Sequence, residues 1–304
     1  MEVNNKSIWP SVAVIMPSYN HSMYVEASIN SILTQNYKNI KLVVIDDCST
    51  DNSVEIIDRL AKKHNFQFIR NSENLGLNKS LQKALDMISS DYVSFLASDD
   101  LIVPTKISEQ IEYLLAKSID AVYATGYQLF DDGRTKVINL DHIEKKFQRN
   151  KILDYVYITD SSGPLLQSGL FKMNIIKELV KVRDKFKSDD WALMIKILEF
   201  AKVDFINKPL FYYRQHSDNS HNKYWTTFSM RAEVIFHLTP LALRHVAFAN
   251  LLSSQAQYLF ADKKYILGIR FSLSALMMDF RVSQLKPLIK QIAKNVLVKL
   301  KVMR

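Results

Sequence analysis

The sequence predicts an α/β protein with a mainly parallel, twisted sheet flanked by helices, and a helical extension at its C-terminal end. Two observations support this class. Over the first 130 residues, short apolar runs of the β type alternate with amphipathic helical patterns. From about residue 226 onward the pattern is helical throughout. We therefore expect two domains, residues 1–225 and residues 226–304.

Five short apolar runs predict the buried strands of the first domain. They are Val12–Met16, Lys41–Ile45, Phe66–Ile69, Tyr92–Leu96 and Ala121–Tyr127. Apolar residues at helical spacing separate the first four runs, and strand–helix–strand repeats of this length require parallel pairing with right-handed crossovers. Ligands of such sheets bind beyond the carboxyl ends of the strands, so we expect the chemistry there.

The second half of the chain is less regular. Residues 131–188 are polar and give no clear order of elements, whereas Asp189–Ala201 predicts a helix and Val203–Tyr213 a strand. Leu251–Phe260 and Tyr265–Met278 predict an antiparallel helix pair.

Composition places the chain among ordinary folded proteins. Of its 304 residues 48% are apolar and 23% charged, and only 6 are glycine and 7 proline, which excludes a largely disordered chain. The single cysteine, Cys48, excludes an intrachain disulfide and favours a reducing compartment. The sequence shows neither a signal peptide nor 18 consecutive apolar residues, so we expect a cytoplasmic protein that does not span a membrane.

The net charge of +9 is concentrated at one end, since residues 281–304 carry seven basic side chains and no acidic one. Lysines interleaved with aliphatic residues predict a basic amphipathic helix suited to an anionic membrane surface. These lysines are Lys286, Lys290, Lys294, Lys299 and Lys301. A helix packed on the protein with a solvated lysine face is an equal alternative. No basic stripe interleaved with stacking aromatic residues is visible, so we expect no nucleic-acid partner.

Two pairs of acids follow predicted strands. Asp46 and Asp47 end the second strand, where carboxylates can accept hydrogen bonds from a base or ribose. Asp99 and Asp100 follow the fourth, where paired carboxylates suit Mg²⁺ or Mn²⁺ bridging a diphosphate. At both strand ends the alternative to ligand binding is a structural role, because Asp51 and Asp100 can cap the helices that follow.

A third acidic cluster, Asp189 and Asp190, opens the helix that precedes the last predicted strand. An acid at a helix start is commonly a cap, but it can serve as a general base if it faces a cavity and reaches a hydroxyl. The residues alone leave both roles open.

Six motifs in order resemble the family 2 glycosyltransferases, which have the GT-A nucleotide-sugar-binding fold, over about residues 11–220. They are Val14–Asn20 with its Pro-x-Tyr-Asn turn, Asp46–Asp51, Asn74–Gly76, Phe95–Asp100, Asp189–Trp191 and Tyr213–His216. In this resemblance residues 1–225 are the catalytic domain.

The resemblance implies an inverting transfer of sugar from a nucleotide-diphosphate donor, chiefly a UDP-sugar, to an acceptor hydroxyl. Asp190 would be the catalytic base, and Asp99 and His216 would hold Mn²⁺ or Mg²⁺. The implied donor-binding residues are Pro17, Tyr19, Asn20, Asp46, Asp47, Asn74, Gly76, Lys79, Ser98, Asp99, Asp100 and Arg214. A glycan or lipid-linked acceptor in bacterial surface polysaccharide or lipopolysaccharide assembly would place the protein at the inner face of the cytoplasmic membrane.

Three positions depart from the family pattern. Ala97 replaces the first acid of Asp-x-Asp, so the cation would rely on Asp99, the diphosphate, water and His216. Cys48 stands where glycine is common, and Lys79 is the sole cation near the Asn-x-Gly turn. The loss at Ala97 keeps open a catalytically silent sugar-nucleotide binder. A nucleotidyltransferase would need a Gly-rich basic loop near the N-terminus, and the turn after Pro17 offers none.

Overall fold

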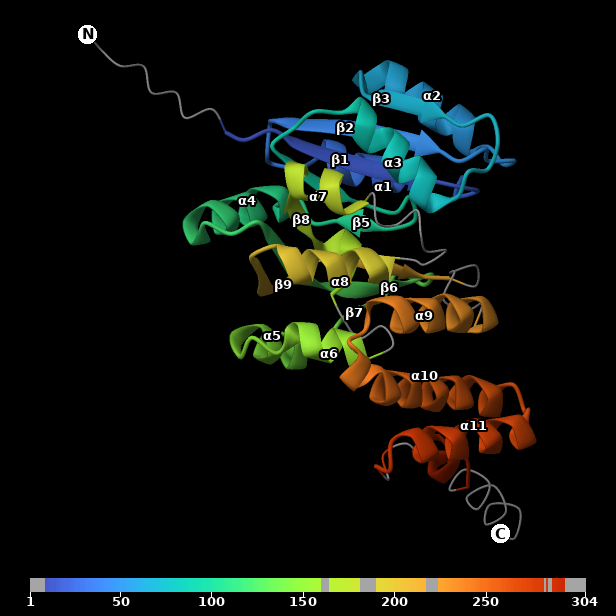
Figure 1. Cartoon of the computed structure of the whole chain (residues 1–304). Helices are drawn as coiled ribbons and strands as arrows, with labels where there is room; N and C mark the ends of the chain where they lie inside the picture. The colour runs from blue at the N-terminus through green and yellow to red at the C-terminus, as the bar shows by residue number, and fades with distance from the viewer. Residues whose placement is uncertain are drawn as a thin grey trace. The chain divides into compact units, whose positions relative to one another are not determined.

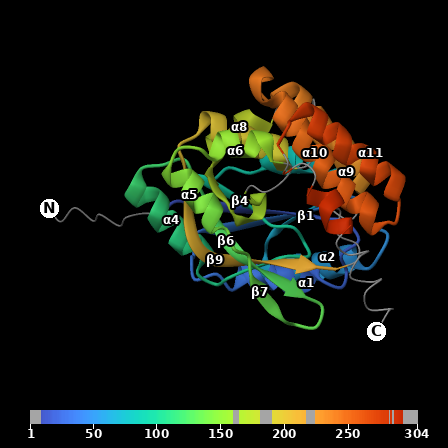
Figure 2. The same cartoon turned by 90° about the horizontal axis from the view of Figure 1, so that it is seen from below.

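The computed structural model describes residues 9–159, 164–180, 190–216, 224–281, 283 and 286–292. The chain divides into two compact units (Figures 1 and 2). One unit comprises residues 1–149, 164–185 and 196–216, and the other residues 150–163, 186–195 and 217–304. Both units are therefore discontinuous in sequence, and the division at residue 225 stays a prediction.

Nine strands within the described residues form a single sheet in the first unit. The strands are β1 Val12–Ser18, β2 Ile40–Asp46, β3 Gln67–Arg70, β4 Tyr92–Phe95, β5 Leu101–Ile102, β6 Ala121–Phe130, β7 Thr135–Val137, β8 Leu170–Lys172 and β9 Val203–Gln215. Their order is β3-β2-β1-β4-β8-β6-β9-β5, with β7 paired to β6. The predicted α/β class with a helical C-terminal extension is confirmed.

The half of the sheet built from β1 to β4 is parallel, as the strand–helix repeats predict. Ser18 at the end of β1 lies opposite Asp46 at the end of β2, and Ile15 lies opposite Phe95 at the end of β4. Because these strands run parallel, their carboxyl ends and the segments that follow them lie at the same edge of the sheet, although β4 ends three residues before β1.

The other half is mixed, since β8, β7 and β5 pair antiparallel while β6 and β9 pair parallel. The short strand β8 lies in the region for which the sequence gives no order. Three residues are too few to show the alternation that identifies a strand. The long β6–β9 pair has register shifts on both sides of Thr125, which bend a ladder locally.

Helices on the sheet supply much of the core. Those assigned to the first unit are α1 Val25–Leu33, α2 Ser53–His64, α3 Leu77–Met87, α4 Lys106–Lys117, α5 Asp141–Gln148 and α7 Met173–Val180, with a 3₁₀ turn at Leu166–Ser168. Ile29 of α1, Ile57 of α2 and Ile107 of α4 are fully buried in one cluster with the apolar residues of β1 and β2. Their helical spacing buries one face of each helix and leaves the other to solvent.

The second unit is helical, with α6 Ile152–Ile158, α9 Tyr224–Leu238, α10 Leu241–Ala261 and α11 Tyr265–Met278. Helices α10 and α11 form the predicted pair, joined at residues 262–264, and Gly268 lets the ring of Phe260 approach closely. Asn250 Nδ2 of α10 donates to the carbonyl of Ile158 at the end of α6 (2.5 Å). Helix α8, Asp190–Phe200, is divided between the two units.

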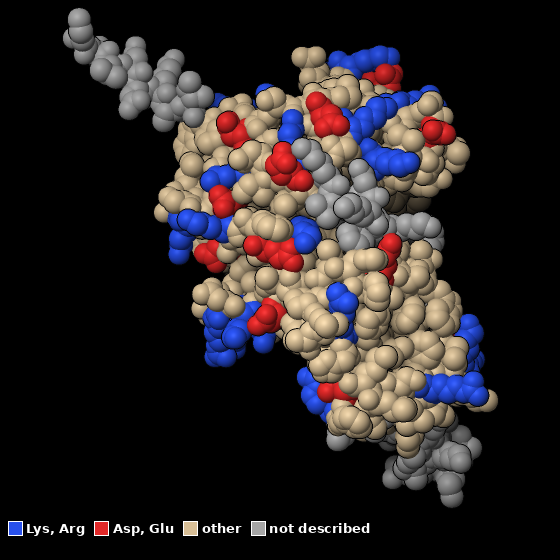
Figure 3. Space-filling model, in the orientation of Figure 1, with Lys and Arg blue, Asp and Glu red and all other residues tan. Residues whose placement is uncertain are grey.

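The helical pair presents a largely uncharged face, as the space-filling view shows (Figure 3). Ile266, Met277 and Phe280 are 74%, 76% and 85% exposed. Residues 286–292 are helical, in agreement with the predicted C-terminal helix, and Lys294, Lys299 and Lys301 lie outside the described residues. No helix in the described part of the chain has both the length and the apolar character to cross a membrane.

Candidate active site

The candidate site lies at the carboxyl ends of β1, β2 and β4. Residues 19–21 follow β1, residues 47–51 follow β2 and residues 96–100 follow β4. Since β1 is hydrogen-bonded to both β2 and β4, the segment after β1 lies between the other two. This edge is where open parallel sheets bind ligands.

Asn20 joins the segments after β1 and β2. Its backbone N–H donates to Ser49 Oγ (2.9 Å), and its side-chain Oδ1 accepts from the N–H of Thr50 (2.8 Å). Asn20 and Cys48 adopt left-handed φ angles of 53° and 66°, a conformation that asparagine tolerates better than most residues. The carboxylate of Asp46 is fully buried and accepts from the N–H and the hydroxyl of Ser49 (2.8 and 2.5 Å). Asp46 therefore shapes the turn that presents Asp47.

Asp47 accepts four hydrogen bonds from the loop before α3 and from the first turns of α3. Its Oδ1 accepts from Asn71 Nδ2, the N–H of Leu75 and Ser80 Oγ, each at 2.9 Å. Its Oδ2 accepts from the N–H of Gly76 (2.8 Å). Gly76 has a φ of 80°, which glycine adopts without strain. One carboxylate thus fixes the Asn74–Gly76 turn, and exposed Lys79 lies one residue before Ser80 on α3.

Asp99 meets two histidines that come from distant parts of the sequence. Its Oδ2 lies 3.0 Å from His216 Nε2, which follows β9, and 3.9 Å from His21 Nε2, which follows β1. One ligand atom from each of the three side chains lies within 4.8 Å of the others. Two imidazoles and a carboxylate at this spacing fit a divalent cation.

Arg214 and Tyr24 support this cluster. Arg214 Nε donates to the backbone carbonyl of Asp99 (2.8 Å), and its guanidinium lies 4.9 Å from the centre of the Tyr24 ring. The Tyr24 ring stacks on His216 with centroids 4.9 Å apart. Guanidinium, phenol and imidazole thus form a stack that limits rotation of the His216 ring.

The side chain of Asp100 points into the protein interior. Its Oδ1 accepts from the backbone N–H of Arg214 (2.9 Å) and its Oδ2 from Gln167 Nε2 (3.1 Å). Burial raises the pKa of Asp100 well above its usual range, and the neighbouring charge of Asp99 adds to the rise. These contacts tie the segment after β4 to β9, so Asp100 positions Asp99 and Arg214.

The remaining predicted residues are distributed as follows. Pro17 is half-buried in β1, Tyr19 is 45% exposed, and buried Ser98 lies with its Oγ 2.8 Å from His21 Nδ1. Asn74 Oδ1 accepts from the N–H of Gly76 (3.2 Å). Helix α8 begins at Asp190, but the side chain of Asp190 lies outside the described part of the chain, as does Asp189.

The sequence interpretation missed His21 and Tyr24, for which it assigned no role. A single histidine after an asparagine carries no periodicity or ligand spacing, and Tyr24 reads as an ordinary residue before a helix. Their position beside the Pro-x-Tyr-Asn turn was the one available signal. Only the pairing of β1 with β4 brings them to Asp99.

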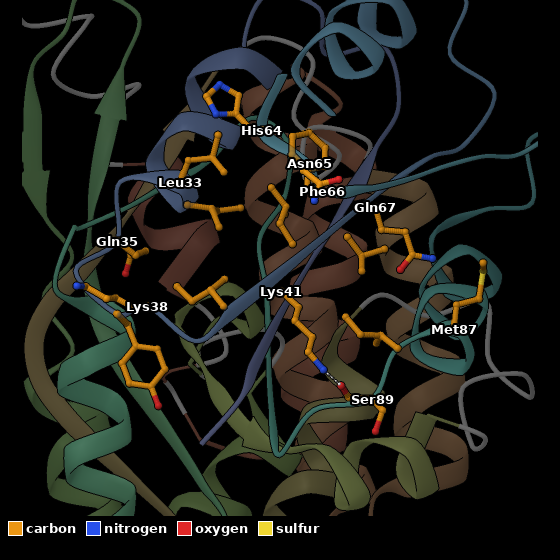
Figure 4. A pocket seen from close by; sticks show the side chains of 16 residues that line it. Leu33, Gln35, Lys38, Lys41, His64, Asn65, Phe66, Gln67, Met87 and Ser89 are labelled. Carbon is orange, nitrogen blue, oxygen red and sulfur yellow. Dashed lines mark hydrogen bonds between the residues drawn. The ribbon is translucent and has the colours of Figure 1, made fainter. Parts of the chain in front are cut away.

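A hollow of about 690 Å³ lies at the opposite, amino-terminal edge of the strands, lined in part by Lys38, Lys41 and His64 (Figure 4). Lys41 Nζ there donates to the carbonyl of Ser89 (2.6 Å). No carboxylate is among its lining residues, so it lacks the ligands for a cation that bridges a diphosphate.

The family model and the structural neighbours show that the chain is a glycosyltransferase with the GT-A fold. Residues 13–172 match the family model "Glycosyl transferase family 2". The chain belongs to this family, and the resemblance of its motifs is confirmed.

Similar proteins of bacteria are also named as glycosyltransferases. An uncharacterized glycosyltransferase of Haemophilus influenzae is 31% identical over 65% of this chain and 75% of its own length. The putative teichuronic acid biosynthesis glycosyltransferase TuaG of Bacillus subtilis is 34% identical over 44% of this chain, which spans about half (53%) of TuaG. WfaP of Escherichia coli, named as a UDP-Glc:α-D-GlcNAc-diphosphoundecaprenol β-1,3-glucosyltransferase, is 29% identical over 70% of this chain and 81% of its own. These relatives include enzymes of bacterial polysaccharide synthesis.

Solved structures show the same fold. S. aureus TarS 1–349 in complex with UDP-GlcNAc has a TM-score of 0.59 at 17% identity, covering 87% of this chain and 81% of TarS 1–349. The mannosyltransferase PcManGT of Pyrobaculum calidifontis, in complex with GDP-Man and Mn²⁺, has a TM-score of 0.60 at 16% identity, covering 94% of this chain and 81% of its own.

Proposed function

We propose that this glycosyltransferase moves a sugar from a UDP-sugar to a hydroxyl of a glycan or lipid-linked acceptor, with inversion, in the assembly of a bacterial surface polysaccharide or lipopolysaccharide. The observation that carries the proposal is the grouping of Asp99 and His216 at the sheet edge that also holds Asp47. This edge combines side chains that could hold a cation with a pre-formed set of loops on neighbouring strands.

The donor would lie across the carboxyl ends of β1, β2 and β4. The nucleoside would contact Pro17, Tyr19 and the loop fixed by Asp47, and the diphosphate would lie at Asp99 with Arg214 and Lys79 as cations near it. The name of WfaP contains UDP-Glc and the TarS structure contains UDP-GlcNAc, which favours uridine. The PcManGT structure contains Mn²⁺, which favours a divalent cation held by Asp99 and His216.

The chemistry requires one proton acceptor and one leaving group. The acceptor oxygen attacks the anomeric carbon while its proton passes to the carboxylate of Asp190, and the bond from that carbon to the diphosphate oxygen breaks on the opposite face. Attack opposite the leaving group inverts the configuration and releases UDP. A bound divalent cation supplies neutralisation of the charge that develops on the diphosphate.

We also propose peripheral contact with an anionic membrane through the C-terminal region. Lys286 and Lys290 are basic residues of the helical segment 286–292, and the exposed apolar residues of α11 lie shortly before them. Apolar side chains beside lysines suit the interface of a membrane that contains acidic lipids.

The donor is testable by thermal shift with a panel of nucleotide sugars, each with and without Mn²⁺. We expect a UDP-sugar to raise the melting temperature in the presence of Mn²⁺, because a ligand that binds only the folded state stabilises it. A GDP- or dTDP-sugar that stabilises more strongly than every UDP-sugar would contradict the uridine assignment.

Two variants separate binding from turnover. Asp99→Asn should abolish the metal-dependent shift, because it weakens a cation ligand, whereas Asp190→Asn should keep the shift and lose turnover in a donor-consumption assay. An Asp99→Asn protein with full metal-dependent binding would show the ligand assignment to be wrong. Full turnover in Asp190→Asn would remove that residue as the base.

A further inference from the structure

The cation site contains a side chain for which neither the motifs nor the comparisons assign a role. We propose that His21 is a direct metal ligand that replaces the carboxylate missing at Ala97. The resulting site of two imidazoles and one carboxylate prefers Mn²⁺ or a similar transition ion to Mg²⁺. The inference rests on the proposed function, since it concerns the cation that would hold the donor diphosphate.

His21 is held in the orientation that a ligand requires. Its backbone N–H donates to Ser53 Oγ (3.0 Å), and its ring Nδ1 lies 2.8 Å from Ser98 Oγ. When Nδ1–H donates to this hydroxyl, the lone pair is on Nε2, the atom nearer to Asp99. A hydrogen bond at one imidazole nitrogen that orients the other is the usual arrangement of metal-binding histidines.

The distances suit a shared cation better than a direct contact between His21 and Asp99. His21 Nε2 lies 3.9 Å from Asp99 Oδ2, which is beyond hydrogen-bond distance. Around an octahedral ion with bonds of about 2.1 Å, adjacent ligand atoms are about 3 Å apart. His216 and Asp99 already have this separation (3.0 Å). To complete a triangle of ligands on one side of such an ion, His21 Nε2 would have to approach Asp99 and His216 by roughly 1–2 Å, since the three ligand atoms lie within 4.8 Å of one another.

Such a triangle leaves the opposite side of the ion to other ligands. Further coordination positions would remain for oxygens of the donor diphosphate and for water. The Asp99 and His216 side chains are 11% and 4% exposed, whereas the His21 side chain is 25% exposed. His21 therefore lies on the more accessible side of the cluster.

The chemical type of the ligands determines which divalent ion the site prefers. Imidazole nitrogen suits Mn²⁺, Fe²⁺, Co²⁺ and Zn²⁺ better than Mg²⁺, which prefers oxygen ligands in near-ideal octahedral geometry. An Asp-x-Asp site offers two carboxylates, but Ala97 removes one of them here. Replacing a carboxylate by a second imidazole shifts the preference away from Mg²⁺.

The inference is tested by measuring Mn²⁺ binding to the full chain in the presence of UDP, with electron paramagnetic resonance as the readout. Wild type, His21→Ala and the control His64→Ala are compared, because His64 is an exposed histidine at the end of α2, in the lining of the hollow at the other edge of the sheet. We expect pulsed spectra to show two coupled imidazole nitrogens in wild type and His64→Ala, and one in His21→Ala. The Mn²⁺ affinity of His21→Ala should fall by roughly tenfold or more.

A second variant keeps the test independent of the stability of His21→Ala. His21→Asp should retain Mn²⁺ binding and let Mg²⁺ displace Mn²⁺ at a lower concentration than in wild type, because it restores a second carboxylate. An unchanged nitrogen coupling in His21→Ala, or an unchanged Mg²⁺ competition in His21→Asp, would overturn the role of His21 while leaving the proposed function intact. Donor binding by wild type that is indifferent to any cation would overturn both.

Discussion

Four acids at the carboxyl ends of two strands have different environments. Asp46 is buried and accepts a hydrogen bond from Ser49, which holds the turn after β2. Asp100 is buried and accepts hydrogen bonds from Arg214 and Gln167, which hold the segment after β4. Asp47 fixes the loop before α3, and Asp99 is the one paired with histidine. Sequence proximity therefore does not indicate a shared role, because adjacent residues after a strand point in different directions.

Lys106 is the other notable titratable residue, since its ammonium group is fully buried. It donates to Ser94 Oγ (2.8 Å) and to the carbonyl of Gly169 (3.1 Å), and desolvation lowers its pKa to about 7. In the unfolded chain its pKa is near the usual 10.5. Between these two values the unfolded state binds more protons, so the free energy of unfolding rises with pH.

Lys106→Met should therefore be more stable than wild type near pH 7, because it removes a buried amine and Ser94 Oγ still donates to the Gly169 carbonyl. Its advantage should shrink by up to about 1.4 kcal/mol per pH unit as the pH rises above 7. Urea unfolding of both proteins at pH 6, 7, 8 and 9 measures the difference. If the difference in unfolding free energy between Lys106→Met and wild type does not change with pH, the lowered pKa of Lys106 is contradicted. Lys63→Met, at an exposed lysine, is the control.

At the element scale, the long β6–β9 pair delivers Arg214 and His216 to the site. Gly126 of β6 allows the buried Phe211 ring of β9 to lie against its backbone, since a Cβ at this position would be 2.4 Å from the ring. The position of β9 along β6 thus depends on the absence of a side chain at residue 126.

Gly126→Ala should destabilise the protein by about 1–3 kcal/mol, the usual cost of overpacking a core. Chemical denaturation measures this change. Phe211→Leu should partly relieve it, so the double variant should lose less stability than the sum of the two single variants. Strict additivity would show that the ring and the added methyl group do not compete for space.

Secondary-structure elements can be predicted from the sequence where their hydrophobic pattern extends over many residues. Strands β1 and β2 contain the continuous apolar runs Val12–Met16 and Leu42–Ile45, and the α10–α11 pair has clear helical spacing, so the sequence predicts both. Strands β5, β7 and β8 have two or three residues each, too few for any periodicity. Their pairing depends on neighbours that are distant along the chain.

At the scale of the whole molecule, the C-terminal region is expected to determine where the enzyme acts. We expect the full chain to float with vesicles that contain acidic lipid and less with purely zwitterionic ones, because lysines and exposed apolar residues act together. Lys286→Glu with Lys290→Glu should reduce the floating fraction, and so should deletion of residues 281–304. Equal recovery of wild type, the double variant and the deletion variant in the soluble fraction would contradict the membrane proposal. Lys63→Glu, at an exposed lysine outside the C-terminal region, is the matched control.

Local sequence patterns are sufficient to predict the fold class, the family and the order of motifs, because these depend on hydrophobic periodicity and on short segments such as Pro17–Asn20 and Asp46–Asp51. Which polar side chains meet depends on how distant segments pack. His21, Asp99 and His216 converge because β1 lies beside β4, and because Asp100 ties the segment after β4 to β9 through Arg214. Strand order is set by packing between distant segments, which no local pattern records.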